Sequence, residues 1–286
     1  MNWNRYSFAN VKLGQFKTPF GYEQLISDTK ILTIERSLPN DRLTDGRQVG
    51  LAVWGDIVTN RLSYNVGAFD GSGVNNSFND NNNFMWAGRV SGVVFDGKIA
   101  DRETRVALGI NGLTTHDTGI TKTGFGFNSV PGGVVDNLFT GRRDAWGVDA
   151  QAKWGALGLE GEYLRSEFKP TGAAHFTSDG WSLAASADVL PKRLKAFAKF
   201  ETFDANLSIF ANTSDVWTFG LNYFVKGDDL KLSLNYLLGN APGAPEHGQG
   251  RLLARVQLIF KTESPALTWA GTNAKTQRSG AATKAD

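Results

Sequence analysis

Regular alternation of apolar and polar residues constrains the fold of this chain more than any other feature of the sequence. In residues 145–154, AWGVDAQAKW, every second residue from Trp146 to Trp154 is apolar, while the residues between them include Asp149 and Lys153. A period of two is typical of a β-strand whose two faces meet different environments. The chain must therefore cover one face of each such strand with apolar surroundings.

The same alternation recurs along most of the chain. Counting each repeat as one element, we predict twelve full strands, at residues 11–17, 47–55, 61–69, 84–95, 104–112, 145–154, 157–168, 181–189, 194–203, 216–225, 230–239 and 251–260, preceded by the end of another strand in 1–8. Their connections alternate between long and short, which is the asymmetry of outer-membrane barrels with long external loops and short periplasmic turns. An open sheet would leave two unpaired edges in lipid. The strands therefore belong to a larger barrel or close into a twelve-stranded one.

Length and composition are compatible with such a barrel without requiring it. The 286 residues suffice for one large β-barrel or for two smaller domains. No window approaches 18 uncharged apolar residues, so we expect no transmembrane helix, whereas a membrane strand needs only ~9–11 residues. The start, MNWNRYSF, lacks the basic and apolar regions of a signal peptide. We expect a secreted barrel with this start to lack its N-terminal part.

One long segment, residues 14–37, departs from the strand pattern. It contains a break at Thr18-Pro19, where proline disfavours continuation of a strand ladder. Its residues GQFKTPFG, followed later by ERS, resemble the first inward-folding loop of the phosphate-selective porin O and P family, and the resemblance extends to about Phe260. It implies an all-β fold, an antiparallel transmembrane β-barrel of sixteen strands that forms a trimeric anion channel in the outer membrane of Gram-negative bacteria.

The resemblance also implies how the chain is divided. If sixteen strands apply, four are missing, the first visible strand is the fifth, and the unusual segment leads into the third external loop, which folds into the pore in this family. We expect a partial barrel domain over residues 1–260, with an inserted pore loop at 18–46. Residues 261–286 are small, polar and unpatterned, which is typical of a disordered tail. This tail departs from the family, whose chains usually stop at the last aromatic residue, here Phe260.

The polar faces of the strands are predominantly basic, although the net charge is only +2. Strand parity places eleven bases opposite the apolar rows: Lys12, Arg61, Arg89, Arg105, Arg143, Lys153, Lys195, Lys199, Lys231, Arg251 and Arg255. Against them stand four acids: Asp149, Glu160, Glu162 and Glu201. A lumen with this excess would concentrate anions, because low-dielectric walls focus the field. The alternative is that these residues only keep the polar faces of a soluble protein hydrated.

Phosphate is bound best by the planar fork of Arg and by Lys acting as a point charge, with hydroxyl groups as further donors. In the inserted loop the residues with this chemistry are Tyr22, Ser27, Thr29, Lys30, Arg36 and Ser37. By resemblance, Lys30 and the serines are the expected constriction contacts. Arg36 follows Glu35 and could instead pin the loop to the wall through an ion pair. On the strands we predict a pore lining of Arg61, Arg89, Arg105, Lys153, Lys199 and Arg255.

The sequence contains partial signs of other functions, which fit it less well than a porin does. Residues 27–30 match S-x-x-K and residues 122–124 match K-T-G, two motifs of penicillin-binding serine hydrolases, but the third motif and long helices are missing. A closed twelve-stranded barrel of an autotransporter translocator or a barrel enzyme is a nearer alternative. The three histidines fall in predicted loops far apart, and the Asp- and Asn-rich residues 70–83 do not have EF-hand spacing for Ca²⁺. We expect small anions and outer-membrane lipid as partners, and no nucleic acid, catalytic residue, metal or cofactor.

Overall fold

The computed structural model describes residues 1–73, 79, 81–121, 138–241 and 247–260. These residues form thirteen strands and two short helices. The strands are β1 Asn2–Trp3, β2 Asn10–Lys17, β3 Arg47–Val58, β4 Leu62–Phe69, β5 Met85–Ile99, β6 Arg102–Thr121, β7 Leu138–Trp154, β8 Leu157–Pro170, β9 Phe176–Leu190, β10 Leu194–Asp204, β11 Thr213–Lys226, β12 Leu230–Asn240 and β13 Arg251–Leu258. The helices, α1 Tyr22–Leu25 and α2 Leu38–Leu43, both lie in the predicted inserted loop.

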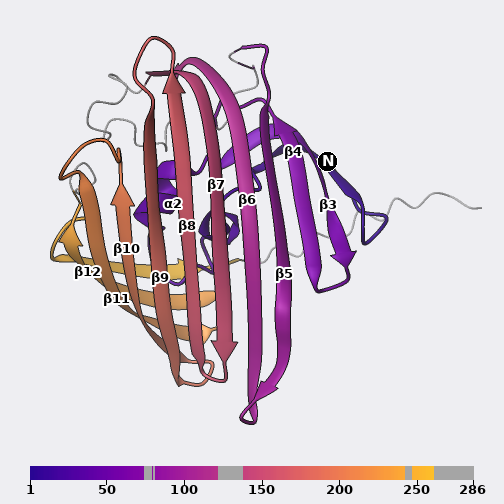
Figure 1. The fold of residues 1–286 in the computed structure, drawn as a ribbon. Coiled ribbons are helices and arrows are strands. Elements are labelled where there is room, and N and C mark those ends of the chain that lie inside the picture. Colours follow the sequence, from indigo (N-terminus) through magenta and orange to yellow (C-terminus); the bar gives the residue numbers. More distant parts are fainter. Residues whose placement is uncertain (74–78, 80, 122–137, 242–246, 261–286) are drawn as a thin grey trace, which may run out of the picture.

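All thirteen strands form one antiparallel sheet in which each strand pairs with its neighbours in sequence, from β1 to β13. The sheet curls, with the inserted segment on its concave side (Figure 1). Among the described residues no hydrogen bonds join β13 to β1 or β2, so the closed twelve-stranded alternative is not what the structure forms. Short connections share one end of the sheet, which we call the short-turn end: 59–61, 100–101, 155–156, 191–193 and 227–229.

The twelve predicted full strands are confirmed, but several are longer than the sequence pattern indicated. β6 continues to Thr121 instead of ending at residue 112, and His116 therefore lies in a strand and not in a loop. β9 begins at Phe176, so the connection after β8 covers only residues 171–175. Apart from Leu113 and Phe176, which join the buried inner cluster, these extensions carry mostly polar residues, because they lie beyond the outer apolar band, and polar runs of this kind predict loops.

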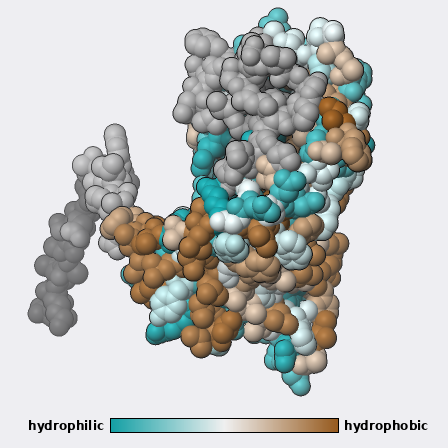
Figure 2. All heavy atoms as spheres, turned by 90° about the vertical axis from the view of Figure 1, so that its left-hand side faces the viewer, coloured by the Kyte–Doolittle hydropathy of each residue, from teal (hydrophilic) through white to brown (hydrophobic). Residues whose placement is uncertain are grey.

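The outward side of the sheet is apolar over the central part of the strands. On β11, Trp217, Phe219, Leu221 and Tyr223 are exposed, whereas the alternate residues Val216, Thr218 and Asn222 point inward and are buried. Figure 2 shows hydrophobic residues gathered over the lower part of one face of the molecule. No helix in the described parts of the chain has the length and apolar character needed to cross a membrane. A curled sheet with an apolar outer band is the architecture of a transmembrane β-barrel.

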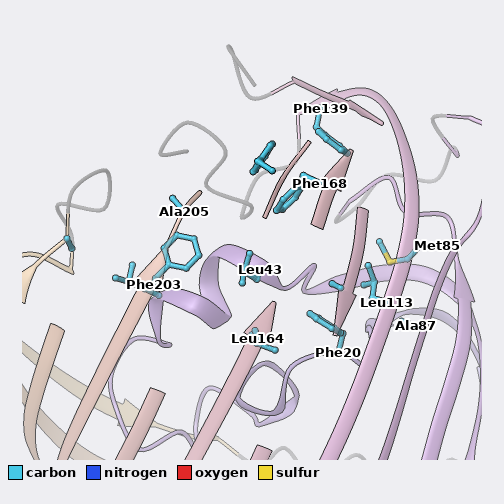
Figure 3. Packing of buried hydrophobic residues seen from close by; sticks show 14 of the residues in the cluster. Phe20, Leu43, Met85, Ala87, Leu113, Phe139, Leu164, Phe168, Phe203 and Ala205 are labelled. Carbon is cyan, nitrogen blue, oxygen red and sulfur yellow. The ribbon is translucent and has the colours of Figure 1, made fainter. Parts of the chain in front are cut away.

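The inner side is not polar throughout, contrary to what simple parity predicts. Phe20, Leu38 and Leu43 of the inserted segment are buried against inward-facing apolar side chains near the opposite, long-loop end of the sheet (Figure 3). This cluster includes Phe69, Met85, Leu113, Phe139, Leu164, Phe168, Phe176, Phe203, Val216 and Leu237. The sheet therefore has an apolar inner layer that packs the insert, and a polar inner layer nearer the short-turn end.

Opposite faces of β7 should respond differently to a new charge. Ala150 is exposed in the outward row between Trp146 and Trp154, whereas Gln151 faces inward and donates to Asp149 (2.6 Å). A lysine on the lipid face near the bilayer midplane costs ~2–4 kcal/mol, and one in a hydrated lumen costs little. We expect Ala150→Lys to reduce the folded fraction in lipid vesicles, measured by heat-modifiable gel mobility. Gln151→Lys is the matched control, and equal folding of both variants would contradict the assignment of faces.

Candidate functional site

The inserted segment, residues 18–46, crosses the concave side of the sheet. Its path depends on Gly21, which has φ +82° and where a Cβ atom would meet Cγ2 of Thr44 at 2.6 Å. Glycine adopts this backbone conformation without steric cost. The second helix begins after Ser37 and has Pro39 in its first turn, where the fixed φ of proline suits a helix start. The segment thus folds as two short helices joined by an irregular loop.

Glu162, on β8, holds the first helix against the sheet. Its carboxylate accepts hydrogen bonds from the backbone N–H groups of Tyr22 and Glu23 (3.2 Å for Glu23) and from the side-chain amide of Asn40 (3.1 Å). Glu162 is 7% exposed. The first N–H groups of a helix have no partner within the helix, so a carboxylate placed there satisfies them. One wall residue therefore anchors both α1 and α2.

A second carboxylate, Glu201 on β10, anchors the start of α2. It accepts a hydrogen bond from the backbone N–H of Leu38 (3.2 Å) and forms an ion pair with Lys199 (2.9 Å). Glu23 links the two helices, because it accepts from the N–H (2.8 Å) and the hydroxyl (2.6 Å) of Ser37 and lies 3.5 Å from Lys199. Lys199 and Ser37, both predicted pore residues, are consequently buried in contacts that hold the insert.

The irregular part of the insert is held by strands from the other side of the sheet. Four wall side chains donate to it: Lys231 to the Thr29 carbonyl (2.8 Å), Asn222 to the Leu32 carbonyl (2.8 Å), Arg255 to the Ile34 carbonyl (3.2 Å) and Arg251 to the Glu35 carboxylate (3.3 Å). Backbone carbonyls of an irregular loop have no ladder partners, so these donors replace them. The insert is thereby tied to β8 and β10 at one end and to β11–β13 at the other.

Arg36 folds the insert upon itself. Its guanidinium donates to the carbonyls of Glu23 (3.2 Å) and Ile26 (3.0 Å) and forms an ion pair with Asp28. The ion pair with the wall that was the alternative for Arg36 is made by its neighbour Glu35, which pairs with Arg251. The hydroxyl groups of Ser27 and Thr29 also bond each other, at 2.9 Å.

Two basic residues of the wall are neutralised by acids, one from the wall itself and one from the insert. Arg89 donates to Asp149 (2.8 Å), whose side chain is fully buried, and this pair occupies the space next to Gly109, where a Cβ atom would collide with both partners. Arg143 forms a buried ion pair with Asp45 at the end of the insert. Buried charges such as these need a partner of opposite charge, because an isolated buried charge is costly.

A cavity of about 400 Å³ remains between the insert and the short-turn end of the wall. We call it the lysine cavity. Its basic lining residues are Lys30, Arg105, Lys153, Lys195 and Lys231, and its acidic ones are Glu160, Asp188 and Asp228. Lys195 lies 3.6 Å from Asp188 and Lys231 lies 3.7 Å from Asp228. Within the described part of the chain, neither Lys30 nor Lys153 has a carboxylate within ion-pair distance.

A second cavity of about 350 Å³, the arginine cavity, contains Arg61, Arg89 and Arg105. Tyr22 and Arg105 line both cavities. The hydroxyl of Tyr22 donates to Glu160 (3.4 Å), and burial, together with the neighbouring carboxylates, raises the pKa of this hydroxyl. Tyr22 therefore stays protonated near neutral pH, and its neutral ring forms part of the wall of both spaces.

The predicted site residues thus separate into two groups. Those around the two cavities are Tyr22, Lys30, Arg61, Arg89, Arg105 and Lys153. Those that hold the insert or bond within it are Ser27, Thr29, Arg36, Ser37, Lys199 and Arg255. The sequence prediction missed the anchoring role of Glu23, Glu162 and Glu201. The one sign of this role in the sequence is Pro39 soon after Ser37, which predicts the start of a helix, where backbone N–H groups need acceptors from outside the helix.

The alternative functions have no matching geometry in the described residues. Ser27 is exposed and lies outside both helices, and residues 122–124 lie outside the described residues. His247 is buried beside Glu35 (3.9 Å), far in sequence from His116 and His175. Within the described ranges, no three His, Asp or Glu side chains come together as metal ligands. Residues 70–83 are described only in part.

Comparison with known proteins gives a consistent picture. A family model described as phosphate-selective porin O and P matches residues 1–260. No curated protein sequence matches the chain significantly. Among solved structures, the chain is similar to the anion-selective porin from Comamonas acidovorans (15% identity, 89% of this chain and 71% of that one, TM-score 0.54). It is also similar to OprB of Pseudomonas putida (13%, 85% and 67%, 0.54) and to the trimer form of OmpT of Vibrio cholerae (15%, 82% and 67%, 0.52). At these identities, the structures support the fold alone.

Removal of the Glu162 charge should loosen the insert. In Glu162→Gln only the amide oxygen can accept, and the new NH₂ group faces donors that were previously satisfied. Loss of a charged acceptor costs about 1–3 kcal/mol, so the detached state should become roughly tenfold more populated. We expect faster trypsin cleavage after Lys30 in the detergent-folded protein, measured by mass spectrometry.

The control is Glu167→Gln on the same strand, because Glu167 is exposed and pairs only with Lys169 (3.0 Å) among the described residues. It should leave the cleavage rate unchanged. If Glu162→Gln and Glu167→Gln are cleaved at the same rate, Glu162 does not anchor the insert.

Proposed function

The chain belongs to the phosphate-selective porin O and P family, and we propose that its pore passes small anions, phosphate and related oxyanions among them, by passive diffusion past basic residues. As a member of this family it is a porin of the bacterial outer membrane, that is, a channel and not an enzyme. Selectivity for anions, and for phosphate among them, is the part that we propose.

The observation that carries the proposal is the pair of lysines in the lysine cavity. Lys30 comes from the insert and Lys153 from β7, and neither has an acid at ion-pair distance in the described residues. Their charges are therefore available to a mobile ion. In a narrow lumen with low-dielectric walls, such charges raise the local concentration of anions and repel cations.

Arginine at the junction of the two cavities suits an oxyanion. Arg105 is paired with Asp96 (2.8 Å), but both side chains are more than half exposed. Exposed ion pairs contribute little stability, so Arg105 can exchange this partner for a passing anion at small cost. Its planar fork can donate two hydrogen bonds to a phosphate, which a spherical chloride ion cannot accept in the same way.

We further propose that residues 1–260 form one barrel domain with the pore loop 18–46 inserted. The tail predicted at residues 261–286 lies outside the described residues. Both edges of the sheet need partners at membrane depth, and a sixteen-stranded barrel would supply them. A homotrimer is also proposed. Its support is the trimer form of OmpT of Vibrio cholerae, whose fold the chain shares at 15% identity.

Charge reversal at Lys30 tests the anion pathway. Lys30→Glu places a negative charge in the lysine cavity, and a change of two unit charges several Å from the ion path alters the ion's energy by about 1 kcal/mol in a water-like medium. We expect the anion-to-cation permeability ratio to fall about fivefold, measured from reversal potentials in planar bilayers across a KCl gradient. Lys30→Arg keeps the charge and should keep the ratio.

The wild-type reversal potential decides the broader proposal. Cation selectivity of the wild-type channel would exclude an anion pathway. An unchanged ratio in Lys30→Glu, with normal insertion, would place Lys30 away from the path of the ions and leave Lys153 as the residue to reverse.

A further inference from the structure

The lysine cavity has an apolar side that an inorganic anion would not need. Tyr22, Ile26 and Leu32 of the insert line it, together with Phe224 from β11. All four are only partly buried, so each leaves apolar surface open to the cavity. On the polar inner layer of a water-filled channel, such residues are the exception. Apolar surface kept open in a concave site, next to a few polar groups, is typical of sites for organic ligands.

The apolar side is held in place by contacts that do not use the free lysines. Tyr22 is fixed through its backbone by Glu162 and through its hydroxyl by Glu160. Lys231 is buried, donates to the Thr29 carbonyl and lies 5.8 Å from the ring centre of Phe224. A preorganised apolar wall binds a ligand at a lower entropic cost than a mobile one.

We propose that the lysine cavity binds small organic carboxylates, with the carboxylate at Lys30 and Lys153 and an aromatic or branched aliphatic body against Ile26, Leu32 and Phe224. This inference rests on the proposed anion pathway and names a ligand class for it. A volume of about 400 Å³ lies within the range of small-molecule sites, roughly 300–1,000 Å³. An inorganic phosphate could meet the charges of this site but would leave its apolar wall in contact with water.

Two carboxylates of equal charge test the proposal: benzoate, which has a ring, and acetate, which has a methyl group. Each is added to single channels that conduct chloride in planar bilayers, and the concentration that halves the chloride conductance is measured. Removal of roughly 60 Å² more apolar surface from water corresponds to about tenfold in affinity. We expect benzoate to halve the conductance at about one tenth of the acetate concentration.

Leu32→Asn replaces an apolar lining residue by a polar one of similar size and should bring the ratio of the two concentrations close to one. The matched control is Leu207→Asn, an exposed leucine in the connection between β10 and β11 that does not line the cavity. It should leave the ratio near ten. Ile26→Asn provides the same test if the Leu32 variant does not insert. Lys153→Gln should raise both concentrations and keep their ratio.

The outcomes separate this inference from the proposed function. If benzoate and acetate act at equal concentrations in an anion-selective channel, the organic site is excluded and the anion pathway stands. A ratio that persists in both the Leu32 and Ile26 variants also overturns the site, because the preference would then come from elsewhere. Cation selectivity in KCl alone would overturn the proposed function itself.

Discussion

The hydrogen bonds between wall carboxylates and the backbone of the inserted segment determine where everything else in the pore can lie. A segment of 29 residues inside a barrel carries many N–H and C=O groups that no strand ladder can satisfy. Glu162 and Glu201 accept hydrogen bonds from N–H groups at the starts of the two helices, which have no partner within the helix, and Lys231 and Asn222 donate to carbonyls between the helices. Without these partners, the insert would have to solvate its backbone in the lumen and would lose its fixed place.

This arrangement also accounts for how acidic wall residues can coexist with the basic pore lining that we propose. Asp149 is neutralised by Arg89, and Glu201 by Lys199. Glu162 is occupied by backbone and amide donors of the insert. These acids therefore bind groups of the protein itself, whereas the side chains of Lys30 and Lys153 are exposed to solvent. The count of charges by strand parity is a poor measure of the field that an ion meets.

The strands could be predicted well from the sequence because, across the membrane, each strand has lipid on one side and the pore on the other. This contrast produces the alternation of apolar and polar residues along the strand. The prediction failed beyond the membrane-spanning part of the sheet, at the end of β6 and the start of β9, where neither side of the strand faces lipid. The geometry of the candidate site could be predicted in part. Lys30 and Lys153 follow from strand parity and loop position, whereas the burial of Lys199 depends on partners such as Glu23, which only the fold brings near.

Tyr22 connects the stability of the insert to the properties of the pore. Its ring belongs to both the lysine and the arginine cavities, and Arg89 lies 6.0 Å from its centre. The position of the ring is set by Glu162 at the backbone and by Glu160 at the hydroxyl. The carboxylates that hold the insert therefore also fix the shared wall of the two cavities. Because the same groups do both, a change in the anchoring of the insert necessarily changes the shape of the space between the lysines and the arginines.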